Sequence, residues 1–575
     1  MKILLIYPYW LEARVHTEDV VNAPIGVYYI GAVLKEEGYD VEILNWHDMN
    51  GMARKIREIL EDKKPDVIGF SILQANRFGG LEIARIAKEL NPDVKIVFGG
   101  VSATFLWKHF LKNFPEVDFV VLGEGEYTFL NLVRCIEKGE YERLKDIGGL
   151  AFREDGKLVK TKESELITNL DELPNPAKYF TYQHLSLTRG CPGKCTFCGS
   201  PMFWGPKVRS HSADYFVDQL EAQYKRGISF FYVSDDTFTM NKKRVIEVCE
   251  KILEKGLQIN WAAISRVNYV NEEVLSWMRR AGCIQISFGV ESGSEKIRQV
   301  LNKKITAEQI KSAFAAAMKY GILARAYFIY GCPGENKRTI QDTIDLIREI
   351  KPLVINFFVL SLFPGTALYR DFQKKARVPD DVWLKPIEDI KYFETDPKLS
   401  EEMVFSFGQK IKTAYYESLP AFVDAIELVD EKEFYPLHSD FCARLGMTFD
   451  QGDYARNEAV PEKQRLAEDL YKKALAYFPD STAYLGLGMI LQRKRQYKES
   501  IGLLSEGVSH FPDNERLSLC LAVSYMNLGD FEMALSHLLK FQDSKQAVHF
   551  AAICHKALGN FDSERALLEK LQSMP

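Results

Sequence analysis

Three cysteines lie close together near the middle of the chain, at Cys191, Cys195 and Cys198. Their C-x3-C-x2-C spacing groups three thiolates, which are the ligands of iron–sulfur clusters. A cluster of four irons needs four ligands, so three cysteines leave one iron open to bind and reduce a small molecule. The alternatives are a zinc knuckle or three unrelated buried thiols. No fourth Cys or His follows Ser200 at ligand spacing, so the spacing favours a 4Fe-4S cluster over zinc.

The N-terminal part that precedes these cysteines reads as a doubly wound, Rossmann-like α/β domain. Short apolar strands alternate there with helical patterns, which indicates a parallel sheet. Strands are expected at residues 3–7, 41–44, 67–71, 96–99 and 119–122. Such sheets bind ligands outside the carboxyl ends of their strands. The turns at those ends contain Ser71, Gly99, Gly100, Ser102, Gly123, Glu124 and Gly125. No G-x-G-x-x-G follows the first strand, which argues against a dinucleotide.

The part that contains the cysteines alternates strands and helices again and predicts a partial (β/α) barrel. Strands are expected at residues 230–233, 258–263, 285–289, 324–329 and 355–360. Active-site groups of parallel barrels lie at the C-terminal ends of the strands. Polar or turn-forming residues stand at these ends: Ser234, Asp235, Asp236, Ser265, Arg266, Glu291, Gly331 and Pro333. The acidic residues among them also suit helix N-caps, which is the structural alternative.

The cysteine run, with Phe197 just before the last cysteine, resembles the signature of the radical S-adenosylmethionine (radical SAM) enzymes. The resemblance implies that the reduced cluster splits S-adenosylmethionine (SAM) to a 5'-deoxyadenosyl radical, with an electron donor such as flavodoxin or ferredoxin. It also implies that SAM contacts Ser234, Asp235, Asp236, Ser265, Arg266, Glu291, Gly331 and Pro333. The chain departs from the family at Cys332, where an aliphatic residue is usual.

The first 145 residues resemble the cobalamin-binding domain of one branch of radical SAM enzymes. The resemblance rests on Pro24 to Gly26, the strand ending at Ser71, the turn at Phe98 to Gly100, and Gly123 to Glu126. It implies cobalamin contacts at Ser71, Gly99, Gly100, Ser102, Gly123, Glu124 and Gly125. The D-x-H-x-x-G ligand motif is missing, so we expect His47 not to bind cobalt. The alternative is a vestigial domain that binds nothing or binds substrate.

The domain boundaries follow from these patterns. We expect a cobalamin-binding-like domain at residues 1–145, a connector at 146–184, the barrel at 185–370, a helical cap at 371–461 and all-α repeats at 462–575. Tyr497 recurs as Phe531 and Pro479 recurs as Pro512, close to the period of roughly 34 residues that tetratricopeptide hairpins have. Stacked hairpins suit a peptide or protein partner. The alternative is a plain helical bundle.

The composition indicates which partners and which cellular compartment to expect. Its 575 residues carry 74 Lys and Arg against 79 Asp and Glu, a balance that indicates no nucleic-acid partner. No signal peptide and no run of about 18 apolar residues stands in the sequence. The ten scattered cysteines do not form a disulfide framework. We therefore expect a cytoplasmic protein without a membrane span.

These inferences combine into a cobalamin-dependent radical SAM enzyme that transfers a methyl group to an unactivated carbon of a small molecule or peptide. Within the enzyme class, the alternatives are ring closure, as in the related anaerobic porphyrin-ester cyclases, another rearrangement, or methylthiolation. An alternative of another class is a tetratricopeptide adaptor with a degenerate barrel. The intact cysteines and downstream motifs speak against the adaptor. The sequence does not specify the substrate.

Overall fold

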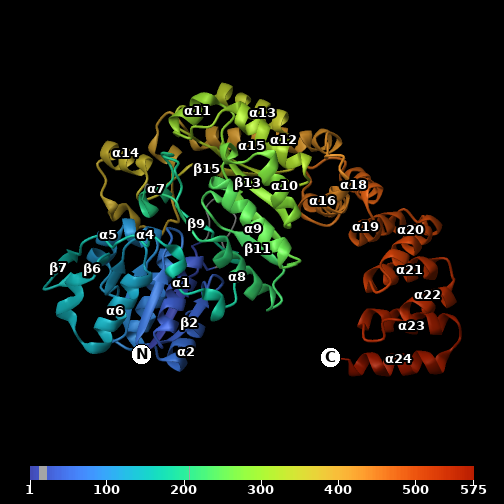
Figure 1. The fold of residues 1–575 in the computed structure, drawn as a ribbon, viewed down its shortest axis with the longest axis horizontal. Helices are drawn as coiled ribbons and strands as arrows, with labels where there is room; N and C mark the ends of the chain where they lie inside the picture. The colour runs from blue at the N-terminus through green and yellow to red at the C-terminus, as the bar shows by residue number, and fades with distance from the viewer. Residues whose placement is uncertain (12–22, 206, 575) are drawn as a thin grey trace. The chain divides into compact units, whose positions relative to one another are not determined.

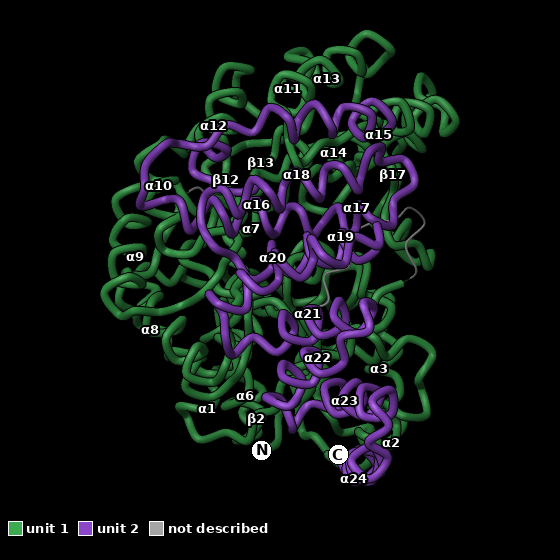
Figure 2. The backbone as a smooth tube through the Cα atoms, turned by 90° about the vertical axis from the view of Figure 1, so that its right-hand side faces the viewer, with its two compact units in different colours: residues 1–316, 324–412 green, residues 317–323, 413–575 purple. Residues whose placement is uncertain are grey.

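The computed structural model describes residues 1–11, 23–205 and 207–574 (Figure 1). The chain forms two compact units (Figure 2). The first comprises residues 1–316 and 324–412, and the second comprises residues 317–323 and 413–575. Within the described residues, no helix has both the length and the apolar character needed to cross a membrane.

The first unit begins with a seven-stranded sheet that confirms the predicted doubly wound domain. In spatial order its strands are β2 (Asp40–Asn45), β1 (Lys2–Tyr7), β3 (Val67–Ser71), β4 (Lys95–Gly99), β5 (Phe119–Val121), β6 (Leu150–Glu154) and β7 (Lys157–Lys160). The ladders from β2 to β5 are parallel, and β6 and β7 are antiparallel. The last two strands lie in the stretch that the sequence assigned to a connector.

Helices cover both faces of this sheet because its strands are apolar on both sides. The helices are α1 (Ile25–Glu36), α2 (Ala53–Lys63), α3 (Arg77–Leu90), α4 (Val101–Phe105), α5 (Trp107–Asn113) and α6 (Glu126–Lys138). Ile3 and Leu5 of β1 face the core formed with α1 and α6. Leu4 and Ile6 alternate to the opposite face, where α2 and α3 pack. The buried strands thereby present their C-terminal turns at one edge.

A six-stranded sheet follows and confirms the predicted partial barrel. Its spatial order is β15 (Val354–Val359), β14 (Leu323–Tyr330), β13 (Cys283–Glu291), β12 (Asn260–Ser265), β11 (Phe230–Val233) and β8 (His184–Leu185). The pairs β8–β11, β11–β12, β12–β13 and β14–β15 are parallel. Two short antiparallel pairs accompany the sheet, β9 (Thr188–Arg189) with β10 (Arg209–Ser210) and β16 (Ser361–Leu362) with β17 (Ile390–Lys391).

Several helices of this part start at capping side chains. Ser212, Asn241, Asn271 and Asn336 each accept a hydrogen bond from a backbone N–H in the first turn of the helix that follows. The helices are α7 (Ser200–Trp204), α8 (Ala213–Tyr224), α9 (Lys242–Glu254), α10 (Glu272–Arg280), α11 (Glu295–Val300), α12 (Ala307–Lys319), α13 (Lys337–Ile350) and α14 (Ala367–Ala376). Each crossover returns the chain so that the next strand ends at the same edge.

The second unit is helical, as predicted, apart from its short connections. Its helices after α15 (Glu401–Asp424) are α16 (Tyr435–Asp450), α17 (Asp453–Arg456), α18 (Lys463–Tyr477), α19 (Ser481–Arg493), α20 (Tyr497–His510), α21 (Glu515–Asn527), α22 (Phe531–Leu538), α23 (Lys545–Ala557) and α24 (Phe561–Ser573). Small residues let neighbouring helices approach, since a Cβ atom added to Gly488 of α19 would lie 2.6 Å from Leu504 of α20. Helices α20 and α22 start at Tyr497 and Phe531, which is the spacing of a helical repeat.

Helix α16 also belongs with these helices. The sequence placed it in a cap that ends at residue 461, but Ser439 of α16 donates a hydrogen bond to the Phe478 carbonyl after α18 at 2.8 Å. A Cβ atom on Gly446 would lie 2.9 Å from the Tyr471 ring of α18. The helical unit therefore extends further toward the N-terminus than the predicted repeats, with Thr413 as its boundary.

Candidate active site

The three cysteines lie on one loop between β9 and α7, and all three thiols are free and partly exposed. Gly190 opens the loop with φ +103°, and a Cβ atom there would lie 3.3 Å from the Lys207 carbonyl oxygen. Glycine is therefore needed at this turn. The loop lies beside the residues that follow β11, where the Sγ atom of Cys191 is 3.4 Å from the Thr237 hydroxyl oxygen.

Donors surround the sulfur atoms. The Gly193 N–H donates to the Sγ atom of Cys191 at 3.4 Å, and the Arg266 Nη1 atom lies 3.7 Å from the Sγ atom of Cys195. Burial, with a smaller contribution from Asp236, raises the pKa of the Cys198 thiol to about 11. Binding to a metal would stabilise the thiolate form.

This donor set fits a cluster better than a single metal ion. Among the described residues, no three Cys, His, Asp or Glu side chains are grouped closely enough to hold one ion. A single zinc ion requires such a group. In a four-iron cluster, by contrast, each cysteine binds a different iron. Three thiols along one loop therefore fit a four-iron cluster.

The two aspartates after β11 hold the cysteine loop at its two ends. The Asp235 carboxylate is buried and accepts hydrogen bonds from the N–H groups of Leu187 and Thr188, at 2.9 and 2.5 Å, and from the Thr188 hydroxyl. The Asp236 carboxylate accepts from Ser200 Oγ at 2.6 Å. Burial raises the pKa of Asp235 to about 7, against the lowering effect of its donors. Both side chains were expected to contact SAM, whereas the structure gives Asp235 in particular a role in positioning the loop.

The ends of the next two strands converge on a lysine that the sequence did not single out. Arg266 follows β12, and its Nη2 atom donates to the Lys303 carbonyl at 2.7 Å. Glu291 ends β13 in the left-handed region, at φ +68°, and its Oε1 atom lies 2.6 Å from Nζ of Lys303. Ser265 is buried and bonds to the hydroxyl of Thr239 at 2.5 Å. The structure therefore brings Arg266 and Glu291 together and leaves Ser265 inside the wall.

A tight turn after β14 contains Gly331 and Pro333. The buried Glu335 carboxylate closes it by accepting from the N–H groups of Gly331 and Cys332, at 2.5 and 3.3 Å. Burial raises the pKa of Glu335 to about 7, although these two donors lower it. Cys332 is fully buried, and its thiol belongs to the core rather than to the site.

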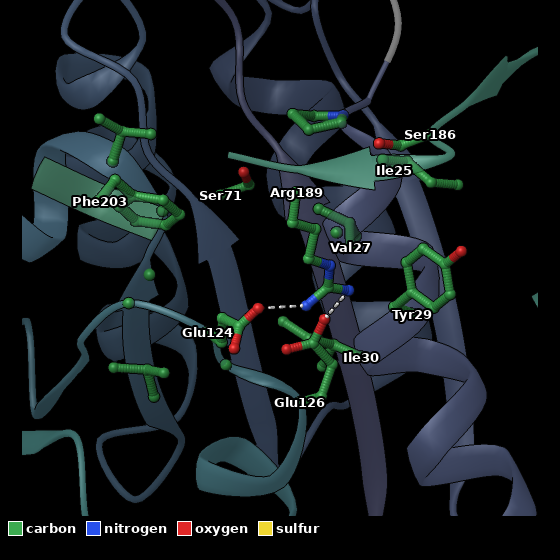
Figure 3. A pocket seen from close by; sticks show the side chains of 18 of the residues that line it. Ile25, Val27, Tyr29, Ile30, Ser71, Glu124, Glu126, Ser186, Arg189 and Phe203 are labelled. Carbon is green, nitrogen blue, oxygen red and sulfur yellow. Dashed lines mark hydrogen bonds and ion pairs between the residues drawn. The ribbon is translucent and has the colours of Figure 1, made fainter. Parts of the chain in front are cut away.

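A cavity of about 380 Å³ lies between the C-terminal edges of the two sheets (Figure 3). Most residues predicted to contact cobalamin line one side: Ser71, Gly99, Gly100, Gly123, Glu124 and Gly125. The other side comes from the barrel and includes His184, Ser186, Thr188, Arg189, Phe203, Trp204, Ser234 and Asp236. Asp236 borders both the cavity and the cysteine loop. The structure thus places the two predicted cofactor regions next to each other.

The wall formed by the first domain suits a large, flat ligand. Gly100 has φ +91°, and a Cβ atom there would lie 3.0 Å from the backbone N and O atoms of Ile72. Gly123 has φ +70°, and an added Cβ atom would contact nothing within 4 Å. Glycine is therefore needed at Gly100 for this turn to pack against Ile72, whereas the backbone at Gly123 is open to a ligand in the cavity. The apolar floor comes from Ile25, Val27, Ile30, Leu73 and Phe129.

Two residues considered as contacts of cobalamin lie outside this cavity. Ser102 is buried, and its hydroxyl donates to Gln74 Oε1 at 3.2 Å, outside the group of described residues that line the cavity. His47 follows β2, is exposed, and pairs with the Asn45 side chain at 3.3 Å. His47 thus lies outside the described residues that line the cavity, and that it does not bind cobalt stays a prediction.

A buried ion network, which the sequence did not reveal, joins the two domains beside the cavity. Arg189 pairs with Glu124 and Glu126, and Arg209 pairs with the second oxygen of Glu124 at 2.8 Å. Burial alone would raise the pKa of Glu124, but Arg209 and Arg189 bring it below its usual value. The Glu124 carboxylate therefore forms ion pairs with two arginines of the barrel part and joins the two domains. Only the placement of Arg189 beside the cysteine motif could have drawn attention to it.

Family comparisons agree with this geometry. Residues 185–347 match the model of the radical SAM superfamily, and residues 14–133 match that of the B12 binding domain. An uncharacterized methyltransferase of Pyrococcus horikoshii is 33% identical over 426 residues, covering 71% of this chain and 92% of the relative. The anaerobic magnesium-protoporphyrin IX monomethyl ester cyclase of Rubrivivax gelatinosus is 30% identical over 399 residues, covering 66% of this chain and 71% of the cyclase.

Solved structures share the fold. The methyltransferase TsrM of Kitasatospora setae, with cobalamin and a 4Fe-4S cluster bound, aligns with a TM-score of 0.58 at 16% identity. The alignment covers 83% of this chain and 99% of TsrM. The cobalamin-dependent SAM radical enzyme OxsB aligns with a TM-score of 0.57 at 17% identity, over 92% of this chain and 84% of OxsB.

Fold and site together define an enzyme with a cobalamin-binding α/β domain beside a three-cysteine partial barrel. The chain belongs to the radical SAM superfamily, in the branch that carries a B12-binding domain. Its cofactors are accordingly a 4Fe-4S cluster, SAM and cobalamin.

Proposed function

We propose that this enzyme transfers a methyl group from SAM to an unactivated carbon of a small molecule or peptide. The observation that carries the proposal is the shared cavity, in which the glycine turns of the cobalamin-binding domain face the barrel strand ends next to the cysteine loop. The bound cofactors supply reductive cleavage of SAM, hydrogen abstraction from the substrate and a methyl group carried by cobalamin.

We assign roles to the chain's own groups as follows. Cys191, Cys195 and Cys198 hold the cluster, and Asp235 positions their loop. Arg266 and Glu291, brought together by Lys303, offer a cation and a carboxylate to the methionine part of SAM. Ser234, Gly331 and Pro333 remain proposed SAM contacts. Ser71, Gly99, Gly100, Gly123 and Gly125 approach cobalamin through their backbone. Holding the reactants in register and excluding water are the protein's share of catalysis.

The names of two relatives bear on the reaction type. One is a methyltransferase and the other a cyclase, so ring closure is the second candidate. Both reactions begin with radical cleavage of SAM and leave 5'-deoxyadenosine, but only methyl transfer also leaves S-adenosylhomocysteine.

The test is an anaerobic incubation of full-length, cluster-loaded protein with SAM, a strong reductant and hydroxocobalamin, followed by chromatography of the products. Methyl transfer predicts 5'-deoxyadenosine together with S-adenosylhomocysteine, the latter only when cobalamin is added. Formation of 5'-deoxyadenosine alone, at the same rate with and without cobalamin, would contradict methyl transfer and favour ring closure.

We also propose an electron donor of the flavodoxin or ferredoxin type, because the cluster must be reduced before SAM is cleaved. All ten cysteines are free thiols, which fits a reducing compartment such as the cytoplasm. The helical unit at residues 413–575 is a proposed site for a protein or peptide partner, since stacked helical hairpins form extended binding surfaces.

A further inference from the structure

Arg189 connects the cysteine loop with the wall of the cavity (Figure 3). It stands two residues before Cys191. Its Nη1 atom lies 2.9 Å from Oε1 of Glu124, and its Nη2 atom lies 2.5 Å from Oε1 of Glu126. All three side chains are at most 7% exposed. Glu124 lies in the turn between β5 and α6 and Glu126 begins α6, so one buried guanidinium joins two segments that are distant in sequence.

The surroundings of the guanidinium fix its orientation. Its carbon lies 5.2 Å from the centroid of the Tyr29 ring and 5.5 Å from that of the Trp204 ring. A planar group held near two aromatic rings can direct separate N–H donors to two carboxylates. A lysine ammonium lacks this planar, fixed arrangement of donors. The simultaneous contacts with Glu124 and Glu126 therefore depend on arginine.

Neighbouring contacts leave little freedom on the side of the loop. Thr188 is tied to the buried Asp235 carboxylate through its N–H and hydroxyl groups. Gly190 occupies a conformation that other residues rarely adopt, close to the Lys207 carbonyl. A shift of Arg189 is therefore passed on to Cys191 rather than absorbed between them.

The turn on the side of the cavity is anchored by hydrogen bonds and ion pairs but leaves room for a ligand. Gly123 borders open space, since an added Cβ atom would contact nothing within 4 Å. The Oε2 atom of Glu126 is buried and has no hydrogen-bond partner within the described part of the chain. Glu124 and Glu126 both line the cavity. A ligand with amide N–H groups, such as the side chains of a corrin, would order this turn and supply the missing donor.

We propose that Glu124, Glu126 and Arg189 couple the cavity to the cysteine loop, so that cobalamin and the cluster stabilise each other's binding. Arg189 is a positioning residue in this scheme, because it acts through the loop and not on substrate. The inference rests on the proposed function in that it takes cobalamin as the ligand of the cavity. Coupling between two binding free energies is reciprocal, so tighter cluster binding in the presence of cobalamin implies tighter cobalamin binding in the presence of the cluster. The rate of iron loss reports on the cluster side of this coupling.

The test measures how fast full-length, cluster-loaded protein loses iron to a chelator under anaerobic conditions, with and without saturating hydroxocobalamin. Corrin absorbance after gel filtration confirms binding in each sample. We expect hydroxocobalamin to slow iron loss about fivefold in the unaltered protein, the lower end of typical coupling. Arg189→Lys keeps the positive charge but loses the planar pair of N–H donors. In this variant, hydroxocobalamin should slow iron loss less than about twofold while corrin is still bound. Glu126→Gln keeps the volume and should have the same effect.

Arg77→Lys is the matched control. Arg77 is also a buried arginine that joins the first domain to a later segment, through the carbonyl groups of Gln74 and Lys385 at 2.7 and 2.9 Å. It lies outside the described cavity lining and should keep the full protection.

Each result is decisive. Equal iron loss with and without bound corrin in the unaltered protein would overturn the coupling but leave the proposed function intact. Full protection in both Arg189→Lys and Glu126→Gln would also overturn it, as would loss of protection in Arg77→Lys. If no corrin binds to the unaltered protein, the proposed function fails together with the coupling.

Discussion

The Nζ atom of Lys303 lies 2.6 Å from the Oε1 atom of Glu291, and each side chain is only 7% exposed. Glu291 ends β13 in a left-handed conformation, so the backbone itself directs the carboxylate toward the lysine. The Lys303 carbonyl also accepts from Arg266. One lysine therefore organises both groups that we propose for the methionine part of SAM.

We predict that Glu291→Ala weakens SAM binding about tenfold, because a charged hydrogen bond contributes roughly 1.5–3 kcal/mol. Iron content should remain unchanged, since Glu291 does not contact the cysteine loop in the described contacts. Equilibrium dialysis of labelled SAM against cluster-loaded protein measures this. Glu295→Ala, at an exposed first-turn acid of α11, is the matched control. Equal affinity in both variants would return Glu291 to a purely structural role.

Replacement of Asp235 should act on the cluster instead. Its carboxylate holds the backbone N–H groups of residues 187 and 188, directly before the cysteine loop. Asp235→Ala leaves these buried donors without a partner, which costs about 1–3 kcal/mol each. We expect the purified variant to contain less than half of the iron of the unaltered protein, as determined by iron and sulfide analysis. Full iron content with weaker SAM binding would show that Asp235 contacts SAM, as the sequence alone suggested.

The raised pKa of Glu335 predicts a pH effect on stability. Burial raises the pKa from 4.5 to about 7, so the folded protein favours the protonated carboxyl. This contribution to stability is complete below about pH 4.5 and is lost as the pH rises to about 7, by roughly 3 kcal/mol in total.

Glu335→Gln removes the titrating group and keeps the size of the side chain. The free energy of unfolding should therefore fall less steeply between about pH 4.5 and 7 in this variant than in the unaltered protein, as measured by denaturant titration at fixed salt. Parallel pH profiles for the two proteins would show that the turn at Gly331 does not bury a titrating carboxyl.

A pair of variants tests the cobalamin-binding wall. His47→Ala should keep full corrin binding, because His47 is exposed outside the cavity. Gly100→Val should abolish it, because its Cβ atom would collide with the backbone of Ile72 at a turn with φ +91°. The ratio of corrin to protein after reconstitution with hydroxocobalamin measures both. Loss of corrin in His47→Ala would contradict our assignment of the cavity.

Most strands of both sheets could be predicted because their signal is local: short apolar runs such as residues 67–71 and 230–233, separated by helices. The two-residue strand β8 was missed because it is too short to give such a run. The cysteine loop and the turns at Gly100 and Gly331 could also be predicted from a local signal, because backbone conformation and ligand spacing determine their residue types. The two antiparallel strands β6 and β7 were missed because they extend the sheet after its last parallel strand and lack a crossover helix.

The groups missed at the site depend on tertiary packing. Lys303 and Arg209 carry no spacing signal, and only folding brings them to Glu291 and Glu124. The contacts of Asp235 with the segment before the cysteine loop were missed for the same reason, since a carboxylate at a strand end can bind a cofactor or a neighbouring segment. That Asp235 contacts SAM stays a prediction.

The extent of the helical unit was missed on similar grounds. The packing of α16 on α18 depends on Gly446 facing the Tyr471 ring, a contact between two different helices. A single glycine within a helical pattern does not indicate which later helix will approach it, so the sequence left α16 in the cap.

The central claim is that Cys191, Cys195 and Cys198 hold the cluster that cleaves SAM. The most direct measurement is 5'-deoxyadenosine release from full-length, anaerobically reconstituted protein with SAM and a strong reductant, compared with a variant in which all three cysteines are alanine. We predict that the unaltered protein binds about four irons and releases 5'-deoxyadenosine, and that the variant does neither while remaining folded. Retained iron and undiminished 5'-deoxyadenosine release in the variant would contradict the claim.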